Sequence, residues 1–424
     1  MFSSSVWMLL LAAVASLHSF AMAQICDMPE RWEVTGFTAF NQTELDIIAR
    51  SCTIFNGHLY VHESFTGRFY LPNVRHIIGN LGLYSSYEPN DGQPRPKLTS
   101  FELPDLETVN RSISLINMSS LKNVSMPKLH SVGGQVGVDA FEELNLRSLE
   151  AVSTMNIGGS LSTLRLDALR EATKHLVISK EDVPPIPALD LSLPSLTEAG
   201  GIQLNGIFSR VAMPQLFNIS LGYSLWESFK INSWGGPPFE VFLPQLAHVS
   251  MDIDISGVIQ GFSMPSMKNM MTSSFRLNTT EQLDLTLPFE QVGAVELYGN
   301  LTSIKFPNLD VARSIEVKTT VPFDCGALKK SVAPAIQHED DWRNQCTAPA
   351  GPGLSPGGKI GVGVGVGVGG LVVIAAALWF FLRRRKQTKR LKSESIAHLR
   401  DMPPSYAETR NHDHPPGYVF THAG

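Results

Sequence analysis

Cysteine is scarce in this chain, which has four in 424 residues: Cys26, Cys52, Cys325 and Cys346. The sequence also lacks histidine-containing clusters with metal-ligand spacing, a nucleophile elbow and a phosphate-binding loop. The glycine run at 361–370 lies inside an apolar stretch, where it cannot cradle phosphate. The sequence therefore predicts no metal, no cofactor, no nucleic-acid partner and no catalytic residue.

Charged residues are absent from 360–382, an apolar stretch that the basic run at 383–386 follows directly. At about 1.5 Å per helical residue, the stretch can cover the roughly 30 Å hydrocarbon core of a bilayer, and the basic run marks its cytoplasmic end. A shorter apolar run at 6–17, followed by Ala21-Met22-Ala23, predicts a signal peptide at 1–23 that is cleaved before Gln24. Both segments together predict a type I single-pass protein of the plasma membrane.

The predicted topology divides the chain into an ectodomain at 24–350, a Gly/Pro linker at 351–359, a transmembrane helix at 360–382 and a cytoplasmic tail at 383–424. A GPI attachment signal is the alternative, but it needs a hydrophobic tail at the extreme C-terminus, and here a basic, polar segment follows the apolar stretch. The tail has nine Lys/Arg against four Asp/Glu, which predicts attraction to anionic lipid of the inner leaflet.

The cysteines form one close pair near each end of the predicted ectodomain, in an oxidising compartment. Their spacing suits local disulfides Cys26–Cys52 and Cys325–Cys346, since other pairings require the two ends of the ectodomain to meet. The exterior part also contains every N-x-[ST] sequon, the acceptor pattern for N-glycosylation. The sequons begin at Asn41, Asn110, Asn117, Asn123, Asn218, Asn278 and Asn300.

A short phrase of the type Leu-Pro-x-Leu recurs through the exterior at intervals of about 20 residues or slightly more. Its copies are LPNV at 71–74, LPDL at 103–106, MPKL at 126–129, LPSL at 193–196, MPQL at 213–216, LPQL at 243–246, MPSM at 264–267 and FPNL at 306–309. Degenerate copies at 146–149, 166–169 and 287–290 keep the register. A repeat of this length predicts a solenoid.

Apolar and polar residues alternate in two stretches of each repeat, one just after the phrase, as at 251–255, and one just before it, as at 283–287. This period of two predicts short strands with one buried face. We therefore expect an all-β fold, a β-solenoid of receptor L-domain or leucine-rich-repeat-like type whose cysteine-paired ends act as caps. Leucine-rich repeats with helices fit less well, because the asparagine expected after their strand is not regular here.

Longer repeats contain insertions at 84–97, 181–190 and 223–240, all before the next phrase. Insertions at one phase of a coil emerge on one side of a solenoid, which is often the binding side. The third insertion is rich in aromatic residues, and Trp226, Phe229 and Trp234 are candidate ligand contacts. The alternative is that these rings pack the loop onto the solenoid.

The signal peptide, the two terminal cysteine pairs, the repeated phrases and the sequons together resemble the fungal cell-wall organisation proteins of the sporulation-specific family. Their solenoid looks like the receptor L-domain. The resemblance covers 25–350 and implies a glycosylated surface protein that supports cell-wall integrity without catalysis, with wall polysaccharide or wall proteins as partners. Many members end in a GPI signal, whereas this chain has an apolar stretch followed by a basic tail.

An enzyme is the third hypothesis, because β-helices also include polysaccharide hydrolases and lyases. Asp252 and Asp254 lie two residues apart, and two carboxylates on one strand face can carry out glycoside chemistry. Strand alternation, however, places both on the solvent face of a strand, which favours a structural interpretation.

The predicted membrane span and tail suggest interactions of their own. Glycines at every fourth residue of 361–369 form a GxxxG face that favours homodimerisation of the span. The tail, which lacks apolar periodicity and predicts disorder, contains two PPxY motifs, the pattern that WW domains bind. We predict WW-domain partners, including a HECT-type ubiquitin ligase, with tyrosine-based sorting as the alternative. The motif residues are Pro403, Pro404, Tyr406, Pro415, Pro416 and Tyr418.

The sequence thus predicts a non-enzymatic, glycosylated single-pass membrane protein that supports fungal cell-wall organisation. Its alternatives are a cell-surface receptor that binds a ligand through the solenoid insertions and a membrane-tethered polysaccharide-active enzyme.

Overall fold

The computed structural model describes residues 24–27, 36–83, 94–180, 187–219, 229–337, 345–349 and 379. The chain divides into two units, Met1–Gly351 and Pro352–Gly424, and all strands and helices named below belong to the first. Among the described residues, no helix is long and apolar enough to cross a membrane. Apart from Trp379, the predicted span at 360–382 lies outside those residues, as do the predicted signal peptide and the tail.

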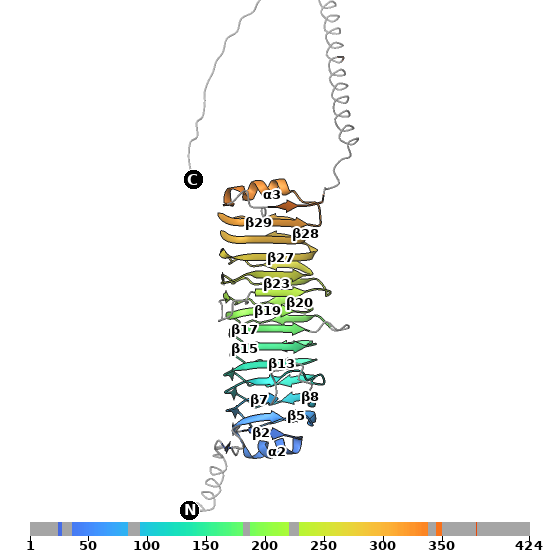
Figure 1. The fold of residues 1–424 in the computed structure, drawn as a ribbon, viewed down its shortest axis with the longest axis vertical. Helices are drawn as coiled ribbons and strands as arrows, with labels where there is room; N and C mark the ends of the chain where they lie inside the picture. The colour runs from blue at the N-terminus through green and yellow to red at the C-terminus, as the bar shows by residue number, and fades with distance from the viewer. Residues whose placement is uncertain are drawn as a thin grey trace, which may run out of the picture. The chain divides into compact units, whose positions relative to one another are not determined.

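The first unit is a parallel β-solenoid of about 12 turns, stacked one above the other as Figure 1 shows. This confirms the predicted all-β solenoid, in which every described strand pairs in parallel with strands of neighbouring coils. A sheet of 21 strands, which we call the broad sheet, covers one side of the coils, and its long strands β27 (Asn269–Thr286) and β28 (Gln291–Lys305) continue past the corner onto the second side. A second side carries two smaller sheets of five and four strands, which we call the narrow face.

The broad sheet contains β1 (Ile25–Asp27), β2 (Gly36–Ala39), β3 (Ile54–Asn56), β4 (His58–Val61), β6 (His76–Ile77), β7 (Leu81–Leu83), β9 (Thr108–Val109), β10 (Ile113–Leu115), β12 (Ser131–Val132), β13 (Gln135–Asp139), β15 (Ala151–Gly159), β17 (Glu171–Lys180), β19 (Glu198–Asn205), β21 (Asn218–Ile219), β22 (Phe229–Ser233), β24 (His248–Val249), β25 (Ile253–Gly257), β27 (Asn269–Thr286), β28 (Gln291–Lys305), β29 (Val311–Thr319) and β30 (Cys346–Thr347). The narrow face contains β5 (Thr66–Tyr70), β8 (Lys97–Glu102), β11 (Asn123–Ser125), β14 (Glu143–Asn145), β16 (Thr163–Arg165), β18 (Leu189–Ser192), β20 (Phe208–Ala212), β23 (Phe239–Phe242) and β26 (Ile259–Ser263).

Each Leu-Pro-x-Leu phrase is a tight turn between the narrow face and the broad sheet. In six of the eight phrases the backbone N–H of the fourth residue donates to the carbonyl of the first, as from Leu106 to Leu103 at 3.3 Å and from Leu129 to Met126 at 3.1 Å. Proline suits the second position of such a turn because its φ is already fixed near the required value. The first and fourth side chains of these two phrases are fully buried, so the phrase recurs because every coil needs the same turn and the same core contacts.

At a buried corner between the two sides, hydroxyl residues and glycines alternate from one coil to the next. Thr279 pairs in register with Gly257 on one side and Gly299 on the other. The Thr279 hydroxyl accepts a hydrogen bond from the backbone N–H of Ile259 at 3.1 Å and donates to its carbonyl at 3.0 Å. Both glycines have positive φ, +149° and +105°, and a Cβ on Gly299 would lie 1.8 Å from the Thr279 carbonyl oxygen. Only glycine fits this close approach of one coil to the next.

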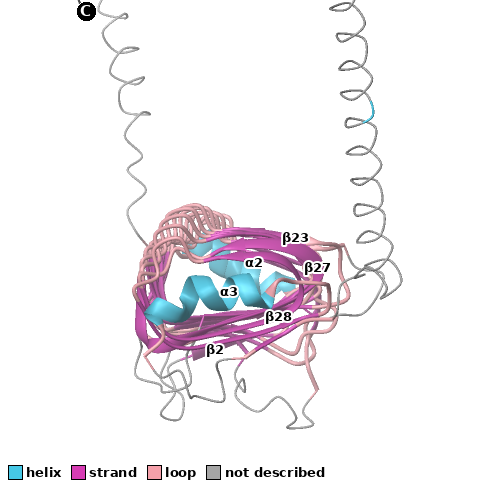
Figure 2. Ribbon diagram, turned by 90° about the horizontal axis from the view of Figure 1, so that it is seen from above, coloured by secondary structure: helices cyan, strands magenta, loops and turns pink. Residues whose placement is uncertain are grey.

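Helices close both ends of the coil stack, a feature that the sequence analysis does not predict. α2 (Gln42–Ser51) covers the N-terminal end, where the Asn41 side chain accepts from the N–H of Glu44 as an N-cap. α3 (Cys325–Val332) and the 3-10 helix η1 (Ala333–Ala335) cover the C-terminal end. Seen along the stack in Figure 2, α2 and α3 lie within the outline of the coils.

Both predicted disulfides are confirmed, and each fastens one of these end helices. Cys26 on β1 bonds Cys52, the C-cap residue of α2, with a Cα–Cα distance of 5.5 Å. Cys325 in the first turn of α3 bonds Cys346 on β30, with a Cα–Cα distance of 5.6 Å. The caps cover strand edges that would otherwise be free to pair with another chain.

Candidate functional site

The outward face of the broad sheet carries a column of charged residues in its C-terminal half. Lys230, Asp254, Arg276, Glu296 and Glu316 are register partners on β22, β25, β27, β28 and β29. Neighbouring parallel strands lie about 4.8 Å apart, so side chains in such a column are close enough to interact.

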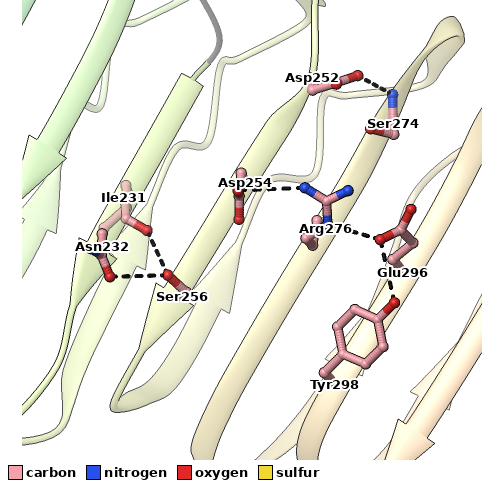
Figure 3. Close-up of polar contacts among 9 residues, drawn as sticks. All are labelled: Ile231, Asn232, Asp252, Asp254, Ser256, Ser274, Arg276, Glu296 and Tyr298. Carbon is pink, nitrogen blue, oxygen red and sulfur yellow. Dashed lines mark hydrogen bonds and ion pairs between the residues drawn. The ribbon is translucent and has the colours of Figure 1, made fainter.

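Arg276 is the centre of a polar network on this column, drawn in Figure 3. Its Nη1 lies 3.5 Å from Asp254 Oδ2, and its Nε donates to Glu296 Oε2 at 2.8 Å. The Tyr298 hydroxyl donates to Glu316 Oε2 at 3.1 Å and lies 3.3 Å from Glu296 Oε2. Lys318 pairs with Glu316 at the far end. The carboxylates of the column are thus held by cations and by a phenol.

Electrostatics favour the protonated forms of the two donors Arg276 and Tyr298. The hydrogen bond from Arg276 to Glu296 raises the pKa of the guanidinium, followed by the attraction of the Glu296 and Asp254 charges. Desolvation raises the pKa of the Tyr298 phenol, and its hydrogen bond to Glu316 raises it further. Arg276 therefore remains a cation and Tyr298 remains a donor at physiological pH.

The two carboxylates considered for glycoside chemistry have structural partners in the next coil. Asp252 Oδ1 accepts a hydrogen bond from the backbone N–H of Ser274 at 2.8 Å, and Asp254 pairs with Arg276. Ile253 and Ile255 between and beside them are fully buried, so alternation places the carboxylates on the outward face, as predicted. In the part of the chain that the structure describes, no group of three or more His, Cys, Asp or Glu residues could hold a metal ion.

A second column of amides and hydroxyls runs beside the charged one. Asn205, Asn232, Ser256, Asn278 and Tyr298 are register partners on successive strands from β19 to β28. The Ser256 hydroxyl lies 3.4 Å from the Ile231 carbonyl and 3.3 Å from Asn232 Oδ1, as Figure 3 shows. We call this column the amide ladder. Its chemistry suits a ligand with many hydroxyl groups, because amides both donate and accept hydrogen bonds.

The structure corrects one of the three aromatic ligand contacts suggested by the sequence. Phe229 is 0% exposed on β22 and packs in the core, so the alternative interpretation of this ring is the right one. Trp234, between β22 and β23, is 39% exposed. Trp226 lies outside the described residues.

The three insertions occur at two different positions within the coil. Residues 84–93 and 181–186 join the broad sheet to the narrow face, after β7 and β17 respectively, whereas 220–228 lie between β21 and β22, both of which belong to the broad sheet. The loop from Trp234 to β23 joins the broad sheet to the narrow face, as the first two insertions do. The expectation of a single insertion phase therefore fails for the third insertion.

The predicted glycosylation sites differ in their surroundings. Asn110 and the helix cap Asn41 are exposed, and the others are half-buried. Asn278 lies on the amide ladder, whereas Asn123 lies on β11 of the narrow face. At Asn300 the side-chain oxygen is buried without a hydrogen-bond partner among the described residues, and the nitrogen donates to the Thr280 carbonyl at 3.4 Å.

Sequence reasoning missed Arg276, Glu296 and Tyr298 as a connected site. The available signal was the recurrence of charged residues at about the repeat spacing, each between two apolar residues of an alternating stretch, as Arg276 lies between Phe275 and Leu277. The PPxY residues and the GxxxG face lie outside the described residues. Comparison of the chain with family models, curated proteins and solved structures found no match.

Proposed function

We propose that this chain is a non-enzymatic, glycosylated single-pass membrane protein whose solenoid supports cell-wall organisation and whose tail recruits WW-domain proteins. The observation that carries the proposal is the outward face of the broad sheet, where carboxylates are neutralised by neighbours and amides form a regular ladder. Such a face suits binding rather than proton transfer, because its charged groups already have partners.

Cell-wall polysaccharide is the partner that this face suits best. A polysaccharide presents hydroxyl groups at short, regular intervals, and the amide ladder presents donors and acceptors at the coil spacing of about 4.8 Å. Tyr298 adds an aromatic ring to the same column. Asn278 lies in the middle of the ladder, so an N-glycan on Asn278 would compete with such a ligand.

Co-sedimentation of the full-length protein with insoluble wall polysaccharide tests this proposal. The combined Asn205→Ala, Asn232→Ala and Ser256→Ala substitutions should lower the bound fraction severalfold. Ser192→Ala, Ser209→Ala and Asn308→Ala combined, on other sides of the coils and outside every sequon, is the matched control and should bind normally. Equal binding by the ladder variant and the control would refute a polysaccharide site on the broad sheet.

The tail proposal has its own test. Tyr406→Ala with Tyr418→Ala should abolish capture by purified WW domains and raise the amount of protein at the cell surface, because two linked motifs bind a multi-WW protein with avidity. The paired change of the non-motif residues Thr409→Ala and His412→Ala is the control. Unchanged capture in the tyrosine variant would refute WW recruitment.

A receptor is the second candidate, and the exposed indole of Trp234 favours it. Aromatic side chains that keep a large exposed surface often anchor a partner. In that case a soluble ligand should increase crosslinking between predicted spans, and Trp234→Ala should remove the increase. Crosslinking that is independent of added ligand would argue against the receptor.

A further inference from the structure

Gln24, the residue that follows the predicted signal cleavage, is fixed to the surface of the N-terminal cap. Its N–H donates to the Thr53 hydroxyl at 2.8 Å, and its carbonyl accepts from the N–H groups of Thr53 at 2.9 Å and Ile54 at 3.2 Å. The disulfide of Cys26 follows two residues later. Cleavage before Gln24 would therefore create an N-terminus that is held on the solenoid rather than at the end of a free arm.

The new amino group would lie beside a hollow of about 410 Å³ whose lining carries two arginines and one aspartate. Its lining includes Arg50, Arg75 and Asp105 together with Gln24 itself. Asp105 already accepts hydrogen bonds from Lys128 at 2.8 Å and from the N–H of Asn73 at 3.0 Å. Arg75 pairs with Glu107 at 3.8 Å, and Arg50 adds a second guanidinium to the lining, so a protonated amino group at residue 24 would lie near like charges, which disfavour the protonated form.

The geometry points to a modification that removes this charge: the N-terminal Gln24 closes to pyroglutamate, a five-membered lactam. The inference rests on the signal cleavage contained in the proposed function. The α-nitrogen attacks the side-chain Cδ, the bond between nitrogen and Cδ forms, and the bond from Cδ to Nε2 breaks. Ammonia leaves with a proton from the α-nitrogen, and no oxidant or reductant is involved.

The lactam keeps the groups that make these contacts. Its nitrogen keeps one hydrogen, which is the one that the bond to the Thr53 hydroxyl needs, and the backbone carbonyl is unchanged. The closed ring is neutral, so it suits this hollow better than an ammonium group. A blocked first residue also protects the strand that carries the Cys26 disulfide from aminopeptidases.

Mass spectrometry of the full-length protein, produced in a eukaryotic secretory host, tests the inference. Free amines are dimethylated on the folded protein before reduction and trypsin digestion, so ring closure during preparation cannot be mistaken for modification in the cell. The expected N-terminal peptide, residues 24–31, is unlabelled at its first residue and lighter than its sequence by one ammonia. Gln24→Ala, which cannot cyclise, is the control and should be fully labelled.

The outcomes separate the inference from the proposal on which it rests. A peptide that begins at Gln24 with a dimethylated amine refutes the lactam but leaves signal cleavage intact. A mature chain that begins at any other residue refutes both the lactam and the predicted cleavage site.

Discussion

Replacing Gly299 by alanine should destabilise the C-terminal coils more than the same change at Gly235. Both glycines have positive φ, +105° and +77°. A Cβ at 299 would lie 1.8 Å from the Thr279 carbonyl oxygen, whereas a Cβ at 235 has nothing within 4 Å. The backbone conformation costs alanine about 1–2 kcal/mol at either site, and the backbone shift forced at 299 adds about 1–3 kcal/mol. We expect a loss of about 2–5 kcal/mol for Gly299→Ala and about 1–2 kcal/mol for Gly235→Ala.

Hydrogen exchange and urea unfolding of the full-length protein measure this difference. Each coil of a solenoid contacts only its neighbours, so Gly299→Ala should raise the exchange rate in β27, β28 and β29 while the N-terminal coils stay protected. Circular dichroism should show an unfolding transition at lower urea for the C-terminal part. Equal losses for the two variants, or wild-type exchange in β28 of Gly299→Ala, would refute the role of the close approach.

Three further predictions concern charge and crosslinking. Burial raises the pKa of the Asp139 carboxyl, so the contribution of this group to stability is present below the unfolded pKa of about 4 and is lost as the pH rises through the folded pKa. Asp139→Asn should therefore raise the melting temperature at about pH 7 but not below about pH 4. An equal effect at both pH values would contradict this. Arg276→Met should cost about 1 kcal/mol in urea unfolding at low salt and less at high salt, because its side chain is 40% exposed; a loss that does not depend on salt would exclude an electrostatic role. The double substitution Cys325→Ser and Cys346→Ser should lower the free energy of unfolding by about 3 kcal/mol and speed hydrogen exchange in α3. Unchanged exchange in α3 would contradict a stabilising role of this disulfide.

The coil was predictable from the sequence because its signals are local and repeated. Pro72 and its equivalents mark the turn, and the alternation in 251–255 marks the strand and its buried face. The cysteine spacing identified both disulfides, since each closes a loop within one end of the ectodomain. These features need no knowledge of neighbouring coils.

Features that depend on contacts between coils were not predicted. The Arg276 network joins residues from successive repeats, and its meaning appears only when the coils are stacked in register. Phe229 was misjudged because β22 lies inside the predicted third insertion at 223–240, and an aromatic residue at the start of a strand can face either side. The cap helix α2 carried a readable signal, Asn41 followed three residues later by Glu44, but it lies before the first repeat phrase and does not share the repeat pattern.

The hydrogen bonds between coils run along the stacking direction that Figure 1 shows, and the described part of the solenoid begins at Gln24, before the N-terminal cap, and ends at Pro349, after the C-terminal one. Tension between these two points therefore acts on the interfaces between neighbouring coils in series and opens them one coil at a time. Each released coil of about 20 residues lengthens the chain by roughly 70 Å. The disulfides close loops only within the end regions, so they leave this stepwise extension unrestricted. Under such tension the solenoid therefore lengthens in steps that are set by the length of each repeat.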